Sequence, residues 1–138
     1  MYKKIFLALS LTLLCQTSFA DKCPSVADIK GNTLHGWKTY DSEEKKQLSH
    51  QRLTQFKNTV EHFVLAEWVN SRGKNTIHCY YSDNNGSTLE AYIAKDHFIP
   101  VNNHHYWYQV SGYIQCAAGA AECAFSKQAF SEAHLAKK

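Results

Sequence analysis

The sequence predicts a single small domain of the α+β to mainly β class. We expect an antiparallel meander of about four strands with one or two short helices, held together by disulfides. Apolar residues alternate with a period of two through residues 62–94, and the turn sequence "DNNG" divides that region. Four cysteines follow a segment typical of an export signal, and an even cysteine count in a small exported domain indicates disulfides.

The first twenty residues have the composition of an export signal. Two lysines form a positive n-region, residues 5–14 are almost entirely apolar, and Ser18 and Ala20 supply the two small side chains of a cleavage site. The apolar run is too short to cross a bilayer, and no later segment is apolar enough to do so. We therefore predict a signal peptide over residues 1–20, a single exported domain with a frayed C-terminal tail over residues 21–138, and a periplasmic or secreted location.

The charge balance argues against nucleic acid as a partner. The chain has 15 lysines and arginines against 12 acidic residues, and two of the lysines belong to the signal. The remaining charges nearly cancel, and no dense basic run with interleaved aromatic residues exists in the sequence. Nucleic acid is therefore not an expected partner of the mature domain.

No cofactor or metal is expected from the motifs. The sequence has no glycine-rich phosphate loop, no Cys-x-x-Cys pair and no His-Glu-x-x-His helix. His97, His104 and His105 are the strongest candidates for a metal site. Adjacent strand residues face opposite sides, however, so His104 and His105 would bind one ion only from an irregular loop.

Three pairings of the four mature cysteines are possible, and the spacing favours one of them. Cys116 and Cys123 are close in sequence, and the intervening segment can bend at Gly119, which leaves Cys23 to pair with Cys79. In the loop-entropy model the short bridge would stabilise the fold by about 2.5 kcal/mol and the long bridge by about 4 kcal/mol. A zinc site is the alternative, but an oxidising compartment disfavours free thiolates.

Two helices and a weak strand are expected before residue 60. Ser25 and Asp28 have the spacing of a capping box, and Gly31 is a natural stop, so one or two helical turns should lie between them. Residues 33–42 read as a weak strand that a glycine interrupts. A second helix is predicted over residues 42–58 with Ser42 as its N-cap, and an irregular exposed segment is the alternative there.

The central strands are predicted over residues 62–69, 76–82 and 88–94. The first has apolar residues on both faces and so suits a central position. Since paired residues of a hairpin share a face, we expect a three-residue loop over residues 84–86, with Gly86 in the left-handed conformation. The resulting register pairs Tyr81 with Leu89 and Cys79 with Ala91.

The fourth strand is predicted over residues 106–116, with a bulge or bend at Gly112. By alternation Tyr106, Tyr108 and Val110 should face the core together with Ile114 and Cys116, while Trp107, Gln109, Tyr113 and Gln115 should face outward. The tail from residue 125 onward could form a short frayed helix.

The outward face of this sheet is the candidate binding surface. Its members would be the aromatic and histidine side chains of the hairpin and the last strand, namely Trp107, Tyr113, Tyr80, Tyr92 and His78. Rigid amphipathic rings supply contact area at low entropic cost, which suits a protein or glycan ligand. We therefore predict a non-catalytic binding module for an unidentified protein or glycan. The alternative for the aromatic stretch at residues 106–116 is core packing alone.

A small secreted hydrolase is the alternative function. A ribonuclease-like acid–base pair could be formed by His50 and His62, with Lys74 nearby and Glu61, Glu67 and Glu90 as available carboxylates. The sequence has no Gly-x-Ser-x-Gly elbow, and the cysteines are expected to be disulfide-bonded. Eight histidines also make a chance pair easy to find, so no catalytic residue is assigned and an enzyme is the less favoured class.

The segments "CPSVADIKG", "IHCYYSDNNGS", "WYQVSGYIQC" and "AECAF" together resemble small exported bacterial proteins with a four-cysteine pattern. Those proteins are domains of unknown function, so the resemblance implies no catalytic residues. A second similarity links "HCYYSDNNGSTLEAYI" to an early hairpin of periplasmic lysozyme inhibitors, which are small, exported and rich in β-structure. The Ser-rich and Lys-Gly inhibitory motifs of that family are missing here, so no inhibitory residue is transferred.

Overall fold

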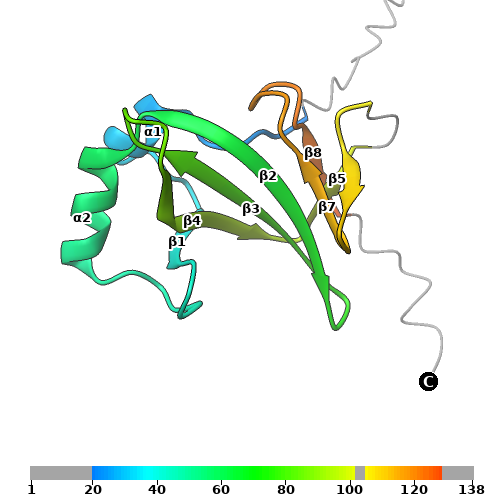
Figure 1. The fold of residues 1–138 in the computed structure, drawn as a ribbon. Coiled ribbons are helices and arrows are strands. Elements are labelled where there is room, and N and C mark those ends of the chain that lie inside the picture. The colour runs from blue at the N-terminus through cyan, green and yellow to red at the C-terminus, as the bar shows by residue number, and fades with distance from the viewer. Residues whose placement is uncertain (1–19, 102–104, 129–138) are drawn as a thin grey trace, which may run out of the picture.

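The computed structural model describes residues 20–101 and 105–128, which form a curved antiparallel sheet with helices at one end (Figure 1). Six strands make up the main sheet in the order β1-β4-β3-β2-β7-β6, and two more form a small second sheet, β5-β8. The fold class predicted from sequence is therefore confirmed. The elements are α1 (Val26–Lys30), β1 (Lys38–Asp41), α2 (His50–Thr59), β2 (His62–Ser71), β3 (Lys74–Ser82), β4 (Thr88–Asp96), β5 (Phe98–Pro100), β6 (Tyr108–Val110), β7 (Tyr113–Cys116) and β8 (Phe125–Lys127).

Helix α1 begins with the predicted capping box. The Ser25 hydroxyl accepts from the backbone N–H of Asp28 at 3.1 Å, and the Asp28 carboxylate accepts from the N–H of Ser25 at 3.3 Å. Gly31 caps the other end, where its N–H donates to the carbonyl of Ala27. Reciprocal capping satisfies backbone donors that so short a helix would otherwise leave unpaired.

Helix α2 begins later than the sequence predicted. Its N-cap is Ser49 rather than Ser42, because the residues between them form a turn that follows β1. The Asp41 carboxylate accepts from the N–H groups of Glu43 and Glu44, and Tyr40 forms an isolated bridge with Gln47. The backbone donors after Ser42 are thus used by this turn and are not available to start a helix.

The β3-β4 hairpin has the predicted three-residue loop but a shifted register. The N–H of Asp83 donates to the carbonyl of Ser87, and Gly86 has a φ of 81°, as the left-handed loop position requires. An irregularity between Tyr80 and Ser82 then displaces the pairing, so that Cys79 pairs with Ile93 rather than with Ala91. Because the pairing shifts by an even number of residues, each side chain of β3 and β4 stays on the face of the sheet predicted for it.

The segment 106–116 is a hairpin, not one strand. Ser111 and Gly112 both have positive φ angles, 46° and 86°, which a two-residue turn of type I′ requires at both central positions. The turn sends β6 back along β7 as the edge strand of the sheet. The prediction of a core-facing row was therefore wrong for Tyr106, Tyr108 and Val110, which are 45%, 48% and 38% exposed.

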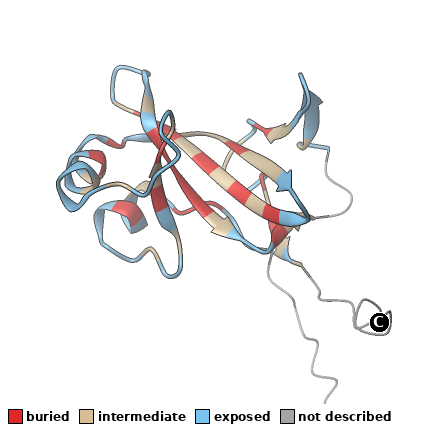
Figure 2. Cartoon of the chain, turned by 90° about the horizontal axis from the view of Figure 1, so that it is seen from below, coloured by how far each residue is buried: buried red, intermediate tan, exposed pale blue. Residues whose placement is uncertain are grey.

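One face of the main sheet carries the core, and we call it the inner face. It is covered by α1, α2 and the β5-β8 sheet, which contribute Ile29, Phe56 and Phe125 to the same cluster as Ile77 and Cys79 of β3. Figure 2 shows the resulting alternation of buried and partly exposed residues along the central strands. The other face, here called the outer face, has no helix packed against it in the described part of the chain (Figure 1).

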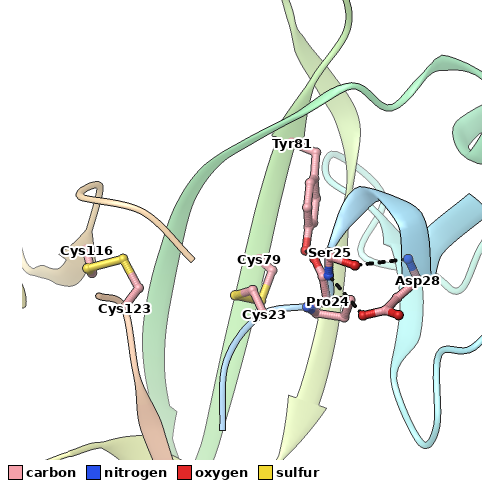
Figure 3. The surroundings of a disulfide bond; sticks show 8 residues. All are labelled: Cys23, Pro24, Ser25, Asp28, Cys79, Tyr81, Cys116 and Cys123. Atoms are coloured by element: carbon pink, nitrogen blue, oxygen red, sulfur yellow. Dashed lines mark hydrogen bonds between the residues drawn. A yellow bond between two sulfur atoms is a disulfide. The ribbon is translucent and has the colours of Figure 1, made fainter. Parts of the chain in front are cut away.

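Both predicted disulfides are present. Cys23 is bonded to Cys79 across a Cα–Cα distance of 5.9 Å, and Cys116 is bonded to Cys123 across 5.5 Å. The first bridge attaches the segment before α1 to the middle of β3, beside the Tyr81 hydroxyl, which donates to the carbonyl of Pro24 at 2.6 Å (Figure 3).

The end of the described chain departs from the predicted helix. Residues 125–127 form β8, which pairs with β5, and residues 129–138 of the expected helical tail lie outside the described residues, as does most of the predicted signal. Within residues 20–101 and 105–128, no helix is both long and apolar enough to cross a membrane.

Candidate functional site

Three tyrosines form a row across the outer face, one from each of three neighbouring strands. Tyr40 of β1 pairs with Tyr92 of β4, and Tyr92 pairs with Tyr80 of β3. The ring centroids of each adjacent pair are 5.6 Å apart, with interplanar angles of 19° and 38°. Directly paired residues in a sheet place their side chains side by side, so the strand register alone assembles this tyrosine row.

His78 and Lys45 enclose the middle of the tyrosine row. The His78 imidazole stacks on the Tyr92 ring with centroids 4.4 Å apart, and the Lys45 ammonium lies 5.5 Å from the centroid of the same ring. Tyr92 is consequently only 5% exposed, although it lies on the outer face. Tyr92 also lines a groove, described below, and its ring faces are covered by neighbours.

Burial keeps His78 neutral at pH 7. Desolvation and, to a lesser extent, the positive charge of Lys45 lower its pKa to about 4, while the Asp96 carboxylate opposes the shift. The Nδ1 atom of His78 lies 4.0 Å from a carboxylate oxygen of Glu67, but the contact is not an ion pair while the imidazole is uncharged. His78 therefore supplies a neutral ring to the site near neutral pH.

This shifted pKa predicts a loss of stability in mild acid. The unfolded chain takes up a proton on His78 near pH 6.5 and the folded chain only near pH 4, so the stabilisation is complete above pH 6.5 and declines as the pH falls toward 4. We expect wild type to lose about 3 kcal/mol more than His78→Gln between pH 7 and pH 4, measured by urea unfolding. Parallel pH profiles of the two proteins would contradict this assignment.

Glu67 links the tyrosine row to the β6-β7 hairpin. One of its carboxylate oxygens accepts from the Gln115 side-chain amide at 2.9 Å, and β2 pairs with β7 so that Glu67 lies beside Gln115. Tyr108 pairs with Gln115 in turn, which places it on the outer face. Burial raises the pKa of Tyr80, with smaller contributions from Glu67, Tyr92 and Tyr113, so its phenol stays protonated.

Four of the five predicted binding residues lie on this outer face, namely His78, Tyr80, Tyr92 and Tyr113. Trp107 does not, and the prediction of its side was wrong. Its ring is partly buried against the core, and its indole N–H donates to the carbonyl of Ala124 at 3.0 Å. The Ser111-Gly112 turn is the reason, because it exchanges the inward and outward positions of residues 106–110 relative to β7.

Tyr40 and Lys45 are site residues that the sequence analysis missed. Both come from the segment around β1, whose pairing partner, β4, is about fifty residues away in sequence. A weak strand broken by a glycine gave no indication of that partner. The local signal was the aromatic Tyr40 within the predicted weak strand, and only the structure shows that Thr39 and Asp41 are buried while Tyr40 is partly exposed.

A groove of about 480 Å³ lies on the outer face over β1, β4 and the adjoining half of β3. Tyr40, Tyr92 and His78 contribute to its lining, together with Lys38, Lys45, Lys74 and Asp96. The ammonium of Lys74 and the carboxylate of Asp96 form an ion pair at 2.9 Å, and hydrogen bonding to Asp96 raises the pKa of Lys74. We refer to this feature as the lysine groove.

The histidines considered for hydrolysis are dispersed in the structure. His50 is exposed at the start of α2, and His62 is exposed at the start of β2. Lys74 lies at the opposite end of the β2-β3 hairpin from His62, because His62 pairs with Ser82 and Lys74 pairs with Ser71. Within residues 20–101 and 105–128 no group of three His, Cys, Asp or Glu side chains could hold a metal ion, and His104 lies outside those residues.

The fold and its outer face define a disulfide-linked, mostly antiparallel β domain with an aromatic sheet face and an adjacent lysine groove. The chain belongs to the DUF3757 family, described as proteins of unknown function, whose family model matches residues 17–126. No curated protein and no solved structure matches this chain.

Proposed function

We propose that this protein is an exported, non-catalytic binding module that contacts a protein or glycan through its outer face. The observation that carries the proposal is the location of the exposed apolar side chains. Among the described residues, the large hydrophobic side chains with the greatest exposure are Tyr106, Tyr108, Val110 and Tyr113, all in or beside the β6-β7 hairpin. Exposed apolar groups gathered in one place mark an interaction surface.

The polar surroundings of these rings support the same proposal. Tyr108 and Tyr113 lie beside Gln115 and Glu67, and the tyrosine row continues the surface across β3, β4 and β1. Protein interfaces commonly have aromatic residues at their centre and polar residues at their rim. The two disulfides hold the sheet that presents this surface and suit the periplasmic or extracellular location that we infer for the mature chain.

We further propose that the source is bacterial and that the ligand is a macromolecule of a host or a competitor. The similarity of residues 78–93 to the hairpin of lysozyme inhibitors makes a secreted hydrolase one possible protein ligand. The ligand would bind the hairpin surface, since the inhibitory motifs of that family are missing from this chain.

The test replaces the two most exposed outer-face rings together. We expect Tyr108→Ser/Tyr113→Ser to lose a ligand that oxidised wild type retains, because tyrosines at an interface centre each contribute more than about 1 kcal/mol of binding. Binding is measured with immobilised protein, both on a glycan array and by mass spectrometry of captured proteins. Gln51→Ala, an exposed change on α2, is the matched control and should bind as wild type does.

Two results would contradict the proposed function. Equal retention by wild type and by the double tyrosine variant would show that the outer face does not bind. Turnover of a captured macromolecule that His62→Ala abolishes, with the fold intact, would instead support the hydrolase alternative.

A further inference from the structure

Positive charge is concentrated in the lysine groove of a protein that is otherwise nearly balanced. Four lysines line it, Lys38, Lys45, Lys74 and Lys95, against the single carboxylate of Asp96. The whole chain has 15 lysines and arginines and 12 acidic residues, so this excess is local and does not reflect the overall charge. A concave surface lined by one sign of charge concentrates field lines and attracts ligands of the opposite sign.

Three of the four groove lysines have no acidic partner. Asp96 is paired with Lys74, and no carboxylate of the described residues lies within ion-pair distance of Lys38, Lys45 or Lys95. The ammonium of Lys45 donates to the carbonyl of Ser42 and lies over the Tyr92 ring. The ammonium of Lys95 lies over the rings of Trp37 and Phe98, which belong to the inner-face core cluster, so its charge is directed away from the outer face. Their charges are thus held in place by neutral groups and are not neutralised.

The tyrosine row adds hydrogen-bond donors to this positive field. Because Tyr40, Tyr92 and His78 stack face to face across strands, their ring faces are covered and their edges point away from the sheet. The edge of an aromatic ring carries the positive part of its quadrupole. Both Tyr40 and Tyr92 line the groove, and no protein group within the described residues accepts a hydrogen bond from either hydroxyl.

We propose that the lysine groove binds the acidic groups of an anionic polysaccharide, with Lys38 and Lys45 as counter-charges and the Tyr40 hydroxyl as a donor. This inference rests on the proposed binding function and names its ligand class. A glycan fits better than an acidic peptide for two reasons. The edge of β1, where a peptide strand could pair, is already hydrogen-bonded to residues 46–48, and the groove has lysines but none of the arginines that form the usual clusters for acidic peptide motifs. The groove lining has few apolar groups, among them Ala94, and many donors that suit a ligand rich in hydroxyls and carboxylates.

The experiment measures binding by isothermal titration calorimetry at pH 7 and low ionic strength, using the oxidised mature chain. The probes are oligogalacturonate, its full methyl ester, chondroitin sulfate oligosaccharide, and a polyglutamate peptide with the same number of carboxylates as the oligogalacturonate. We expect at least one of the two acidic glycans to bind, and to bind more tightly than both the uncharged ester and the peptide. The ester removes only the charge and keeps the sugar backbone.

The variants locate the site. Lys38→Gln/Lys45→Gln should weaken acidic glycan binding by about tenfold or more, because it removes two charged contacts to the acidic groups of the ligand. Lys127→Gln, an exposed lysine on β8 that does not line the groove, is the control for a lysine-to-glutamine change and should leave the affinity as it is. Matching thermal unfolding curves for these proteins show that the fold is unchanged.

Several outcomes would overturn the inference. The first is that neither acidic glycan binds. The second is that the methyl ester binds as tightly as oligogalacturonate, or that polyglutamate binds more tightly than both acidic glycans. The third is that the Lys38/Lys45 variant and the Lys127 variant lose the same affinity for the acidic glycan. In each case the proposed function still stands if Tyr108→Ser/Tyr113→Ser loses a ligand that wild type retains, because that test uses residues outside the groove. Failure of both experiments would remove the function and the ligand class together.

Discussion

Replacing Cys23 and Cys79 together by alanine is expected to lower the free energy of unfolding by about 4 kcal/mol. The bridge closes a loop with a sequence separation of 56 residues, so its loss returns a large conformational entropy to the unfolded chain. The position of the bond also predicts a loss of stability, since the bond holds the segment before α1 against the middle of the sheet (Figure 3). Urea unfolding at pH 7 gives the measurement.

The second disulfide provides the matched control. Cys116→Ala/Cys123→Ala removes the same atoms from equally buried positions but opens a loop with a separation of only 7 residues. The loop-entropy model therefore predicts a smaller loss, about 2.5 kcal/mol. Equal losses in the two double variants, or a larger loss from the short bridge, would show that chain entropy does not set the contribution of these bonds.

Tyr81→Ala is expected to lower the free energy of unfolding by about 3–5 kcal/mol, the usual cost of removing a fully buried aromatic ring. Tyr81 has no exposed surface, and its ring contacts Phe56 of α2 and Phe63 of β2 edge to face, with centroids 6.3 Å and 5.9 Å away. The side chain thus joins α2 to the inner face of the sheet. Thermal or urea unfolding followed by tryptophan fluorescence measures the loss.

Two further variants separate the contributions of Tyr81. Tyr81→Phe keeps the ring but leaves the carbonyl of buried Pro24 without its donor, and should cost about 1–3 kcal/mol. Tyr113→Ala removes the same side chain from a position that is 54% exposed, and should change stability by about 0.5 kcal/mol or less. A loss from Tyr113→Ala as large as that from Tyr81→Ala would contradict the assignment of the inner face as the core.

Features set by neighbouring residues could be predicted from the sequence. The Ser25/Asp28 capping box needs only a three-residue spacing, and the loop ending at Gly86 needs only a turn sequence between two alternating runs. The disulfide pairing followed from the short separation of Cys116 and Cys123. Each of these features depends on local chemistry, so each was confirmed.

The errors occurred where two local interpretations were equally good. Ser42 and Ser49 are both suitable N-caps, and the turn held by the Asp41 carboxylate decided between them. A bend within one strand keeps the phase of an alternating pattern and a two-residue turn reverses it, and Ser111-Gly112 is compatible with either. Reversal at that turn moved Trp107 to the inner face and Tyr108 to the outer face.

The amino-acid sequence by itself determined the fold class, the two disulfides and the strands of the central hairpins, because these depend on spacing and alternation within short segments. Only the tertiary structure decided which rings meet on the outer face, and it brought Tyr40 and Lys45 beside Tyr92. The physical reason is that both faces of these strands carry aromatic residues. Packing of α1, α2 and the β5-β8 sheet selects one of them as the core, and the pairing of β1 with β4 then completes the other.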